Sequence, residues 1–374
     1  MAIYEAYRTF SEAHIAPRAL ALSRENAFDH QSWELLCKTD FWKRIVPKEF
    51  GGFEQDWWGF IAGLEGMASA AQDGGFILTV VSQAAFIHGL NQFGTPEQQS
   101  KYFPQLLAGA LTATAIAEPH TGTDASALKT NAAENTAGNL ILNGKKWNIS
   151  HAPTATVTLV VGRIPERSER DIALFLVDNA QEGVHAGPAQ AKMGNRTIPT
   201  SYLEFKDVAL SDADVLGSKV GGFKALVETV TVARILDGWM GAMLMKPILE
   251  KAMVLIETRA SKGRPLSKHQ YIQLKITNLL IGLKQSRYTG IGAMSQLLNG
   301  HPEAYMTGSI AKLTGAKAFQ EAAQEMVNLF GSAGYLEGEI SHLLNDAMGL
   351  SIVGGTEEMH RINIFNQYRR LSKN

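Results

Sequence analysis

The spacing of apolar residues changes twice along the chain. In its first part the pattern favours helices, and residues 75–90 are rich in apolar residues and small side chains, as in a buried helix. Thr95, Pro96 and Gln98 predict the start of a further helix. Thr caps a helix, Pro fits its first position, and a Gln three residues after the cap closes a capping box. We therefore predict an N-terminal α-helical domain over residues 1–110.

A different pattern follows, made of short apolar and β-branched runs separated by Gly, Asn, Asp and Pro. Such runs predict strands. Asn143-Gly144 lies between two of them and predicts a two-residue hairpin, because both turn positions need a positive φ. We predict a small antiparallel β-domain, sandwich or barrel, over residues 111–215. The predicted strands are 111–117, 139–142, 146–150, 156–163, 172–177 and 202–208.

The helical period returns after Gly221. The first long helix is apolar nearly all round, which is typical of a helix buried inside a bundle, and Pro247 should kink it. Asn299-Gly300 and Gly331 stand where helices should stop. The sequence thus predicts a C-terminal four-helix bundle over residues 216–374 and an α+β multidomain fold for the whole chain. The predicted helices are 222–258, 267–298, 303–330 and 356–370.

Composition excludes several classes of protein. The 374 residues carry a formal net charge of −1 without a long basic run, so nucleic acid is a poor candidate partner. Cys37 is the only cysteine, which leaves no disulfide framework, and we expect no metal site. No apolar stretch approaches the ~20 residues of a membrane span, and residues 1–18 lack the apolar core of a signal peptide. We expect a cytoplasmic protein.

Four segments carry the candidate chemistry. They are Ala115-Ile-Ala-Glu-Pro-His-Thr-Gly-Thr-Asp124, Leu142-Asn-Gly-Lys-Lys-Trp-Asn-Ile-Ser150, Arg259 with Gly263 and His269-Gln270, and Gly354-Gly-Thr-Glu-Glu-Met-His-Arg361. In this order and with this helix–sheet–helix organisation, they resemble the signatures of the acyl-CoA dehydrogenase family over essentially the whole chain. Each motif alone is weak, and their joint occurrence carries the resemblance. It implies a flavoenzyme that binds FAD and acts on the carbons next to a thioester carbonyl.

The resemblance also assigns cofactor-binding positions within one subunit. Backbone groups of the first signature would meet the pyrimidine ring, a Gly would allow close approach to the pyrophosphate, and a strand hydroxyl would reach flavin N5. A Trp that the family places beside the flavin is replaced by Asn148. The positions assigned in this way are Ile116, Ala117, Gly122, Thr123, Asn148, Ser150 and, from the last signature, Thr356.

A second set of positions would contact the cofactor of a neighbouring subunit. These residues are expected at the flavin and at the adenosine end of that cofactor. Sites completed across subunits imply a homodimer at least, and the resemblance implies a homotetramer built as a dimer of dimers. The residues of this second set are Arg259, Ser261, His269, Asn328, Gly331 and Ser332.

The sequence departs from the family at its catalytic base. The carboxylate that usually precedes the Gly-Thr of the last signature is replaced by Gly354. Some members carry the base on the first helix of the bundle, and an ungapped count back from Arg259 places Ala233 at that position. Another register makes Glu228 the base, although it needs a shift against the second helix and an insertion. Neither usual base is securely present.

Two residues are candidate replacements. Asp237 lies four residues after Ala233, on the same helical face, and burial in an apolar helix would raise its pKa toward values useful for a general base. The alternative is that Asp237 forms an ion pair with Arg234, a residue that we also expect to contact the substrate. His120 replaces a small residue in the Glu-Pro turn, and its alternative is a surface turn histidine.

These residues lead to one main hypothesis and two rivals. The first is an FAD-dependent oxidoreductase acting on the Cα–Cβ bond of an acyl thioester, on CoA or on an acyl or peptidyl carrier protein, in oxidation or in reduction. Whether its electrons pass to a partner protein or to oxygen stays open. The changes at the usual base positions and beside the flavin suggest a specialised substrate of secondary metabolism. The rivals are a flavin-dependent monooxygenase on the same fold and a non-catalytic subunit of a heteromeric dehydrogenase.

Overall fold

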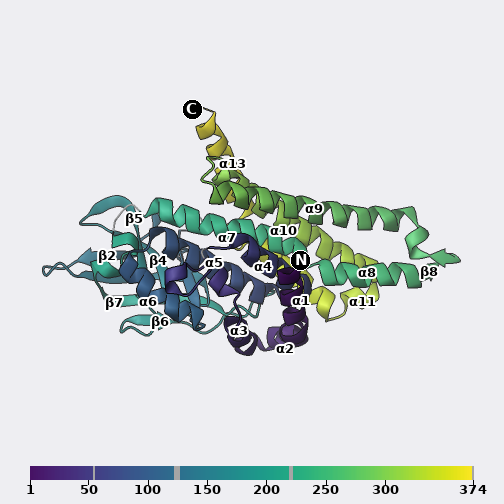
Figure 1. Ribbon diagram of the computed structural model, residues 1–374, viewed down its shortest axis with the longest axis horizontal. Coiled ribbons are helices and arrows are strands. Elements are labelled where there is room, and N and C mark those ends of the chain that lie inside the picture. The colour runs from purple at the N-terminus through teal and green to yellow at the C-terminus, as the bar shows by residue number, and fades with distance from the viewer. Residues whose placement is uncertain (54, 122–126, 219–221, 373–374) are drawn as a thin grey trace.

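The computed structural model describes residues 1–53, 55–121, 127–218 and 222–372. Figure 1 shows an elongated molecule with the strands gathered at one end and the N-terminal helices beside them. Long C-terminal helices run to the opposite end, where β8 lies. The predicted order of helices, strands and helices is confirmed.

Among the N-terminal helices, α1 packs against α4, and α5 is buried along most of its length with α7 (Phe223–Met243) of the C-terminal bundle as its main partner. The side chain of Asp73 caps α5 by accepting a hydrogen bond from Phe76 N (2.9 Å), and Thr95 forms the predicted capping box of α6 with Gln98. Local sequence signals therefore set both helix starts correctly. The helices are α1 (Ala2–His14), α2 (Ala16–Glu25), α3 (His30–Cys37), α4 (Trp57–Ala71), α5 (Gly74–Phe93) and α6 (Pro96–Leu107).

The β-domain is a sheet with the strand order β1-β4-β2-β3-β7-β6, to which β5 is added beside β4. It is mostly antiparallel as predicted, but β1 and β2 both pair with β4 in parallel. Two of its strands, β2 and β6, escaped the sequence pattern. The strands are β1 (Thr112–Ala115), β2 (Asn131–Glu134), β3 (Leu140–Ser150), β4 (Val157–Ile164), β5 (Ser168–Asp178), β6 (Val184–Ala186) and β7 (Thr200–Leu210).

The predicted hairpin at Asn143-Gly144 is wrong. The strand β3 continues through both residues and pairs with β7, and the register shifts there as in a β-bulge. The side chain of Asn143 accepts a hydrogen bond from Asp207 N and donates one to the Asp207 carboxylate, both at 3.0 Å. The positive φ of Gly144 therefore serves a bulge against a strand that is distant in sequence.

The C-terminal bundle contains two helices that the sequence did not predict, Ser332–Tyr335 and Glu339–Leu350. The predicted helices are present with one clear difference. The first of them is broken at Leu244–Met245 instead of kinked, so that Pro247 lies in the first turn of a new helix, where its missing N–H costs nothing. The predicted stops at Gly300 and Gly331 are confirmed. The helices are α7 (Phe223–Met243), α8 (Lys246–Thr258), α9 (Gln270–Leu298), α10 (Ala304–Phe330), α11 (Ser332–Tyr335), α12 (Glu339–Leu350) and α13 (Glu357–Leu371). Between α8 and α9 lies a hairpin of β8 (Ala260–Ser261) and β9 (Arg264–Pro265).

Helices α7 and α10 approach one another through glycines. A Cβ built on Gly315 would lie 1.6 Å from the carbonyl oxygen of Gly238, and one on Gly238 would lie 2.2 Å from that of Ala311. Neither position therefore tolerates a side chain without moving a helix. This contact fixes the residues next to the glycines on both helices.

A buried carboxylate ties α7 to two further helices. Glu65 of α4 accepts hydrogen bonds from Trp239 Nε1 (2.7 Å) on α7 and from Arg287 Nε (2.6 Å) on α9. The Trp239 ring packs over Gly290 of α9, where an added Cβ would meet it at 2.9 Å. Because its charge is paired and its neighbours are packed, Glu65 can be buried at this junction.

The described helices include none that is both long enough and apolar enough to cross a membrane.

The glycine contact gives a stability prediction. Gly315→Ala should lower the free energy of unfolding by about 1–3 kcal/mol or more, because the added methyl group overpacks the α7–α10 contact. Gly292→Ala on the exposed face of α9 is the matched control, since nothing lies within 4 Å of its added Cβ. It should gain about 0.5–1 kcal/mol from helix propensity. Denaturant unfolding of both variants tests this, and equal stability of the two would contradict the packing.

Candidate active site

One part of the site lies where the chain leaves β1 and runs alongside β3. The backbone N–H of Trp147 donates to the carbonyl oxygen of Ala117 (2.8 Å), and Lys146 Nζ donates to that of Ile116 (3.0 Å). These bonds bring the predicted cofactor residues Ile116 and Ala117 beside the end of β3, which carries Ser150. Of the predicted β-domain residues, Ile116 and Ala117 thus lie beside the strand that carries Asn148 and Ser150.

A buried ion pair holds this segment in place. Lys146 is fully buried, and its Nζ lies 2.9 Å from the carboxylate of Glu118. That carboxylate also accepts hydrogen bonds from the backbone of Lys129 (2.8 Å) and Thr130 (3.0 Å). Burial raises the pKa of Glu118, but the hydrogen bonds outweigh it and lower the pKa overall. Burial lowers the pKa of Lys146 to about 8. The Glu of the Glu-Pro turn is therefore an anchor of the loop.

Ala117, Trp147, Asn148 and Ser150 form one wall of the site, and this wall has unused hydrogen-bond donors and exposed surface. Among the described residues, neither the N–H of Ala117 nor the hydroxyl of Ser150 has a hydrogen-bond partner. Asn148 is exposed at a bulge with φ 56°, and the neighbouring Trp147 ring stacks on Tyr202. A flat polar ring could therefore receive hydrogen bonds from this wall.

Three of the predicted positions cannot be placed in the same detail. Gly122 and Thr123 lie outside the described residues. His120 is exposed on the turn after Glu118, which agrees with the alternative of a surface turn histidine. Its role in catalysis stays a prediction.

Thr356 caps α13, where its hydroxyl accepts a hydrogen bond from Met359 N (3.5 Å), and its contact with the cofactor stays a prediction. The residues predicted to contact a neighbour's cofactor lie elsewhere in the chain. Arg259, Ser261 and His269 belong to the β8–β9 hairpin region, where His269 Nε2 lies 3.1 Å from the Ser261 carbonyl oxygen. Figure 1 places this region at the end of the molecule opposite the β-domain. Asn328, Gly331 and Ser332 are exposed where α10 ends. One chain therefore does not join these residues to Ser150, and their contact with a neighbour's cofactor stays a prediction.

The second part of the site is Asp237 in α7. Its side chain is buried, with a residue exposure of 3%, and its Oδ1 has no hydrogen-bond partner among the described residues. Burial raises the pKa of this carboxyl to about 7, although Lys312 and Arg234 partly offset the rise. Neither cation comes within ion-pairing distance in the described structure, so the predicted alternative of a direct Arg234 pair is not seen.

Asp237 lies next to the position of the missing base. Gly354 has a φ of 74°, and a Cβ built on it would lie 3.3 Å from Asp237 Oδ2 and 3.5 Å from Lys312 Cε. Arg234 Nε donates to the Gly354 carbonyl oxygen (3.1 Å). The carboxylate of Asp237 thus occupies space that a side chain at position 354 would enter. Ala233, the other base position, is half-buried on α7 and carries no functional group.

Two residues of this cluster escaped the sequence analysis. Lys312 of α10 is buried, and its ammonium donates to the carbonyl oxygen of Leu350. Burial lowers its pKa to about 8, against the attraction of Asp237. His360 of α13 is buried with both ring nitrogens unpartnered among the described residues, and burial together with Arg234 lowers its pKa to about 3. The only sequence signal for Lys312 was a charge within a small-residue stretch of an apolar helix.

Glu228, the base in the alternative register, lies in a different environment. Its Oε1 is 3.1 Å from His88 Nε2, and its Oε2 accepts from the Tyr305 hydroxyl at 3.5 Å. Nine residues separate it from Asp237, which places the two on opposite faces of α7. The hydrogen bond from His88 is the largest cause that lowers the pKa of Glu228, and neighbouring charges lower it further.

Among the described residues no group of His, Cys, Asp and Glu could hold a metal ion.

The chain thus consists of a helical domain, a β-domain with open donors and a helical bundle with a buried acid, in this order. The family models for the N-terminal, middle and C-terminal domains of acyl-CoA dehydrogenase match residues 1–110, 113–208 and 221–368. The chain therefore belongs to the acyl-CoA dehydrogenase family. Members of this family are FAD-dependent.

Individual relatives agree with this assignment. An acyl-CoA dehydrogenase of Bacillus subtilis is 28% identical over 364 residues, covering 96% of this chain and 95% of the relative. A 3-(aryl)acrylate reductase of Clostridium sporogenes is 28% identical over 358 residues, covering 95% and 94%. The solved butyryl-CoA dehydrogenase from Megasphaera elsdenii superimposes with a TM-score of 0.90 at 25% identity, covering 98% of both chains.

The wall of the β-domain fits the flavin of FAD. It offers an unpartnered backbone N–H at Ala117 and an unpartnered, half-buried hydroxyl at Ser150, both within the described residues, next to the exposed bulge at Asn148. Such donors suit the N5 and pyrimidine edge of a flavin ring.

The buried ion pair beneath this wall is testable. Lys146→Met should lower the free energy of unfolding by about 3 kcal/mol, because it leaves the buried Glu118 carboxylate without its cation. Lys145→Met on the same strand is the control and should cost less than about 1 kcal/mol, since the Lys145 ammonium lies above the Tyr202 and Trp147 rings and is not part of a buried ion pair. Chemical denaturation measures both, and equal losses would refute the anchoring role.

Proposed function

We propose that this protein is an FAD-dependent oxidoreductase of the Cα–Cβ bond of an acyl thioester, with Asp237 as its acid/base. The observation that carries the proposal is the position of the Asp237 carboxylate, 3.3 Å from where a side chain at Gly354 would begin. The family's carboxylate is absent from residue 354, and a buried carboxylate stands beside that position. Its pKa of about 7 matches the requirement for a general acid/base near neutral pH.

The bound FAD supplies a hydride acceptor or donor at the β-carbon of the substrate. Asp237 takes the α-proton during oxidation and returns it during reduction. Lys312 and Arg234 stabilise the ionised form of Asp237. Arg234 donates to the Gly354 carbonyl oxygen, and we propose that it also contacts the substrate. Ile116, Ala117, Asn148 and Ser150 would hold the flavin ring.

The substrate is an acyl group on CoA or on an acyl or peptidyl carrier protein. Oxidation and reduction need an acid/base at the same place, because the carboxyl that accepts the α-proton in one direction donates it in the other. A relative named 3-(aryl)acrylate reductase supports net reduction as one direction for this class. A specialised substrate, of the kind met in secondary metabolism, accounts for the replacement of the usual base. We place the enzyme in the cytoplasm, where its half-buried Cys37 stays a free thiol.

Self-association into a homodimer or homotetramer is part of the proposal. Large apolar side chains stand exposed along α9 and α13, the two helices on the outer edge of the bundle in Figure 1. An exposed apolar face of this kind marks an interface. A second subunit would also bring Arg259 and Asn328 toward a cofactor that one chain cannot reach. The exposed residues include Tyr271, Leu274, Ile281, Tyr288, Ile362, Phe365 and Tyr368.

The role of Asp237 is tested by flavin bleaching. FAD-loaded protein is mixed anaerobically with acyl-CoA and acyl-carrier substrates, and the loss of flavin absorbance is followed. The rate of oxidation should rise with pH through about 7, because only the deprotonated carboxyl accepts the α-proton. Asp237→Asn should be slower by at least about 100-fold and lose this pH step.

The exposed Asp40→Asn is the control for that experiment and should leave the rate and the pH step unchanged. Full activity of Asp237→Asn would remove Asp237 from the mechanism. Oxygen consumption with supplied reduced flavin, in place of bleaching by thioesters, would favour a monooxygenase. Activity only after addition of a second dehydrogenase-like chain would favour a non-catalytic subunit.

The flavin contact of Ser150 has its own prediction. Ser150→Ala should weaken FAD binding about fivefold, the value of one neutral hydrogen bond of roughly 1 kcal/mol. Titration of the apoprotein with FAD, followed by quenching of flavin fluorescence, measures the dissociation constant. Ser211→Ala, exposed beyond β7, should leave it unchanged. An unaltered constant for Ser150→Ala would show that its hydroxyl does not contact the flavin.

A further inference from the structure

A small internal cavity adjoins Asp237. Helices α5, α7, α10 and α12 enclose it, and its polar side chains are Asp237, Asn195 and Asp346. Its volume of about 10 Å³ is close to what one water molecule needs. A water there could bond to Asp237 on one side and to Asn195 or Asp346 on the other, and Asp237 Oδ1 has no hydrogen-bond partner among the described residues. Asp237 and Asp346 therefore line the same small cavity, whose remaining wall is mostly apolar.

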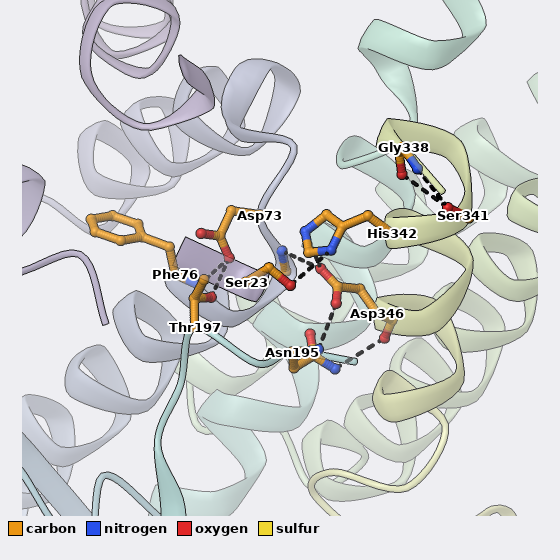
Figure 2. Close-up of polar contacts among 10 residues, drawn as sticks. Ser23, Asp73, Phe76, Asn195, Thr197, Gly338, Ser341, His342 and Asp346 are labelled. Carbon is orange, nitrogen blue, oxygen red and sulfur yellow. Dashed lines mark hydrogen bonds and ion pairs between the residues drawn. The ribbon is translucent and has the colours of Figure 1, made fainter. Parts of the chain in front are cut away.

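Asp346 lies at the centre of a fixed polar network on the far side of this cavity. Its Oδ1 accepts a hydrogen bond from Asn195 N (2.5 Å) and its Oδ2 accepts one from Gly74 N (2.9 Å). Figure 2 shows the carboxylate between Asn195 and His342, with Asp73 and Thr197 close by. The two donors come from two segments that are far from α12 in the sequence, so the carboxylate is held rigidly.

His342 connects Asp346 to the surface. It lies one helical turn earlier on α12, and its Nε2 is 3.4 Å from Asp346 Oδ2 while its Nδ1 is 3.2 Å from the Ser23 hydroxyl (Figure 2). Ser23 and His342 line a surface pocket of about 100 Å³ whose rim includes the exposed Arg24 and Met193. A protonatable ring thus spans the distance between a buried carboxylate and a solvent-filled pocket.

A second buried carboxylate gives this network the capacity to hold a proton. Burial, followed by the nearby charge of Asp346, raises the pKa of Asp73 to about 6. Its Oδ1 accepts from Thr197 and Phe76, whereas its Oδ2 has no partner among the described residues. Asp73 can therefore take up a proton at a pH well above the ordinary range of a carboxyl group.

We propose that Asp346 and His342 form a proton relay between Asp237 and solvent at the α2–α12 face. This inference rests on the proposed acid/base role of Asp237. The physical need is clear from its burial, since a bound acyl chain at Gly354 would close the direct way to bulk water. The cavity and the two side chains offer a path that stays open while substrate or product is bound.

The proton balance of the relay is simple. In oxidation the Cα–H bond breaks, the electron pair forms the Cα–Cβ double bond as hydride leaves the β-carbon for the flavin, and Asp237 holds the proton. The proton then passes to the cavity water, on to Asp346, to the imidazole of His342 and out through the pocket beside Ser23. Reduction runs the same path inward. No additional oxidant or reductant is needed for the relay itself.

The experiment uses FAD-loaded enzyme with a thioester that bleaches it and an electron-accepting dye. His342→Ala should keep the rate of the first bleaching turnover, because Asp237 starts deprotonated above its pKa. Steady turnover should fall at least about tenfold, since each later cycle needs the proton to leave. Imidazole should restore turnover, because the truncated side chain opens space into the surface pocket.

Further variants separate a relay from a packing role. His342→Gln keeps a polar partner for Ser23 but cannot pass protons readily, so it should be as slow as His342→Ala. His185→Ala, on the exposed strand β6, is the histidine control and should turn over normally without any effect of imidazole. Full turnover in His342→Gln, or loss of the first turnover along with the later ones, would overturn the relay.

The outcomes also separate the relay from the function on which it rests. If no thioester bleaches the wild-type enzyme, both proposals fail. If wild type bleaches and His342→Ala turns over at the wild-type rate, the relay alone is wrong and the role of Asp237 stands. If His342→Ala does not fold, the same comparison is made with His342→Gln, whose side chain is smaller but still fills the site.

Discussion

The close contact between α7 and α10 is the constraint on which the rest of the structure depends. Gly238 and Gly315 face each other without side chains, so the two backbones meet where most helix pairs are held apart by side chains. The residue before Gly238 is Asp237, and Lys312 lies one turn before Gly315. The contact therefore sets a buried carboxylate and a buried ammonium beside the loop at Gly354. Glycine here determines the position of the charged groups.

Burial of these charges is costly, and the arrangement shows how the cost is limited. Lys312 donates to a carbonyl oxygen, Arg234 donates to the backbone of Gly354, and both attract Asp237 without pairing with it directly. A direct pair would keep the carboxyl ionised at all neutral pH values. Separation leaves a carboxyl that can exchange its proton near pH 7. The missing side chain at Gly354 leaves room for this carboxylate beside the position that the family's usual base would occupy.

Sequence reasoning worked where the signal is local. The capping box at Thr95 and the helix stop at Gly331 depend on neighbouring residues, and Asp237 stood out as a carboxylate in an apolar helix. Sequence reasoning failed where the local structure depends on a partner that is far away in the sequence. Asn143-Gly144 has hairpin residues, yet its partner is Asp207 on β7, so the same residues form a bulge. Lys312 and His342 gave no usable signal, because their roles arise only when helices far apart in sequence pack together.

The central claim is that Asp237 exchanges a proton with the α-carbon of a bound thioester. The most direct measurement is the exchange of α-hydrogens for deuterium in heavy water, followed by proton NMR on a saturated acyl thioester with FAD-loaded enzyme. Exchange needs the acid/base and the bound substrate but no net oxidation. We expect exchange with the native enzyme and none above background when Asp237 is replaced by Asn. Equal exchange by the two proteins would contradict the account.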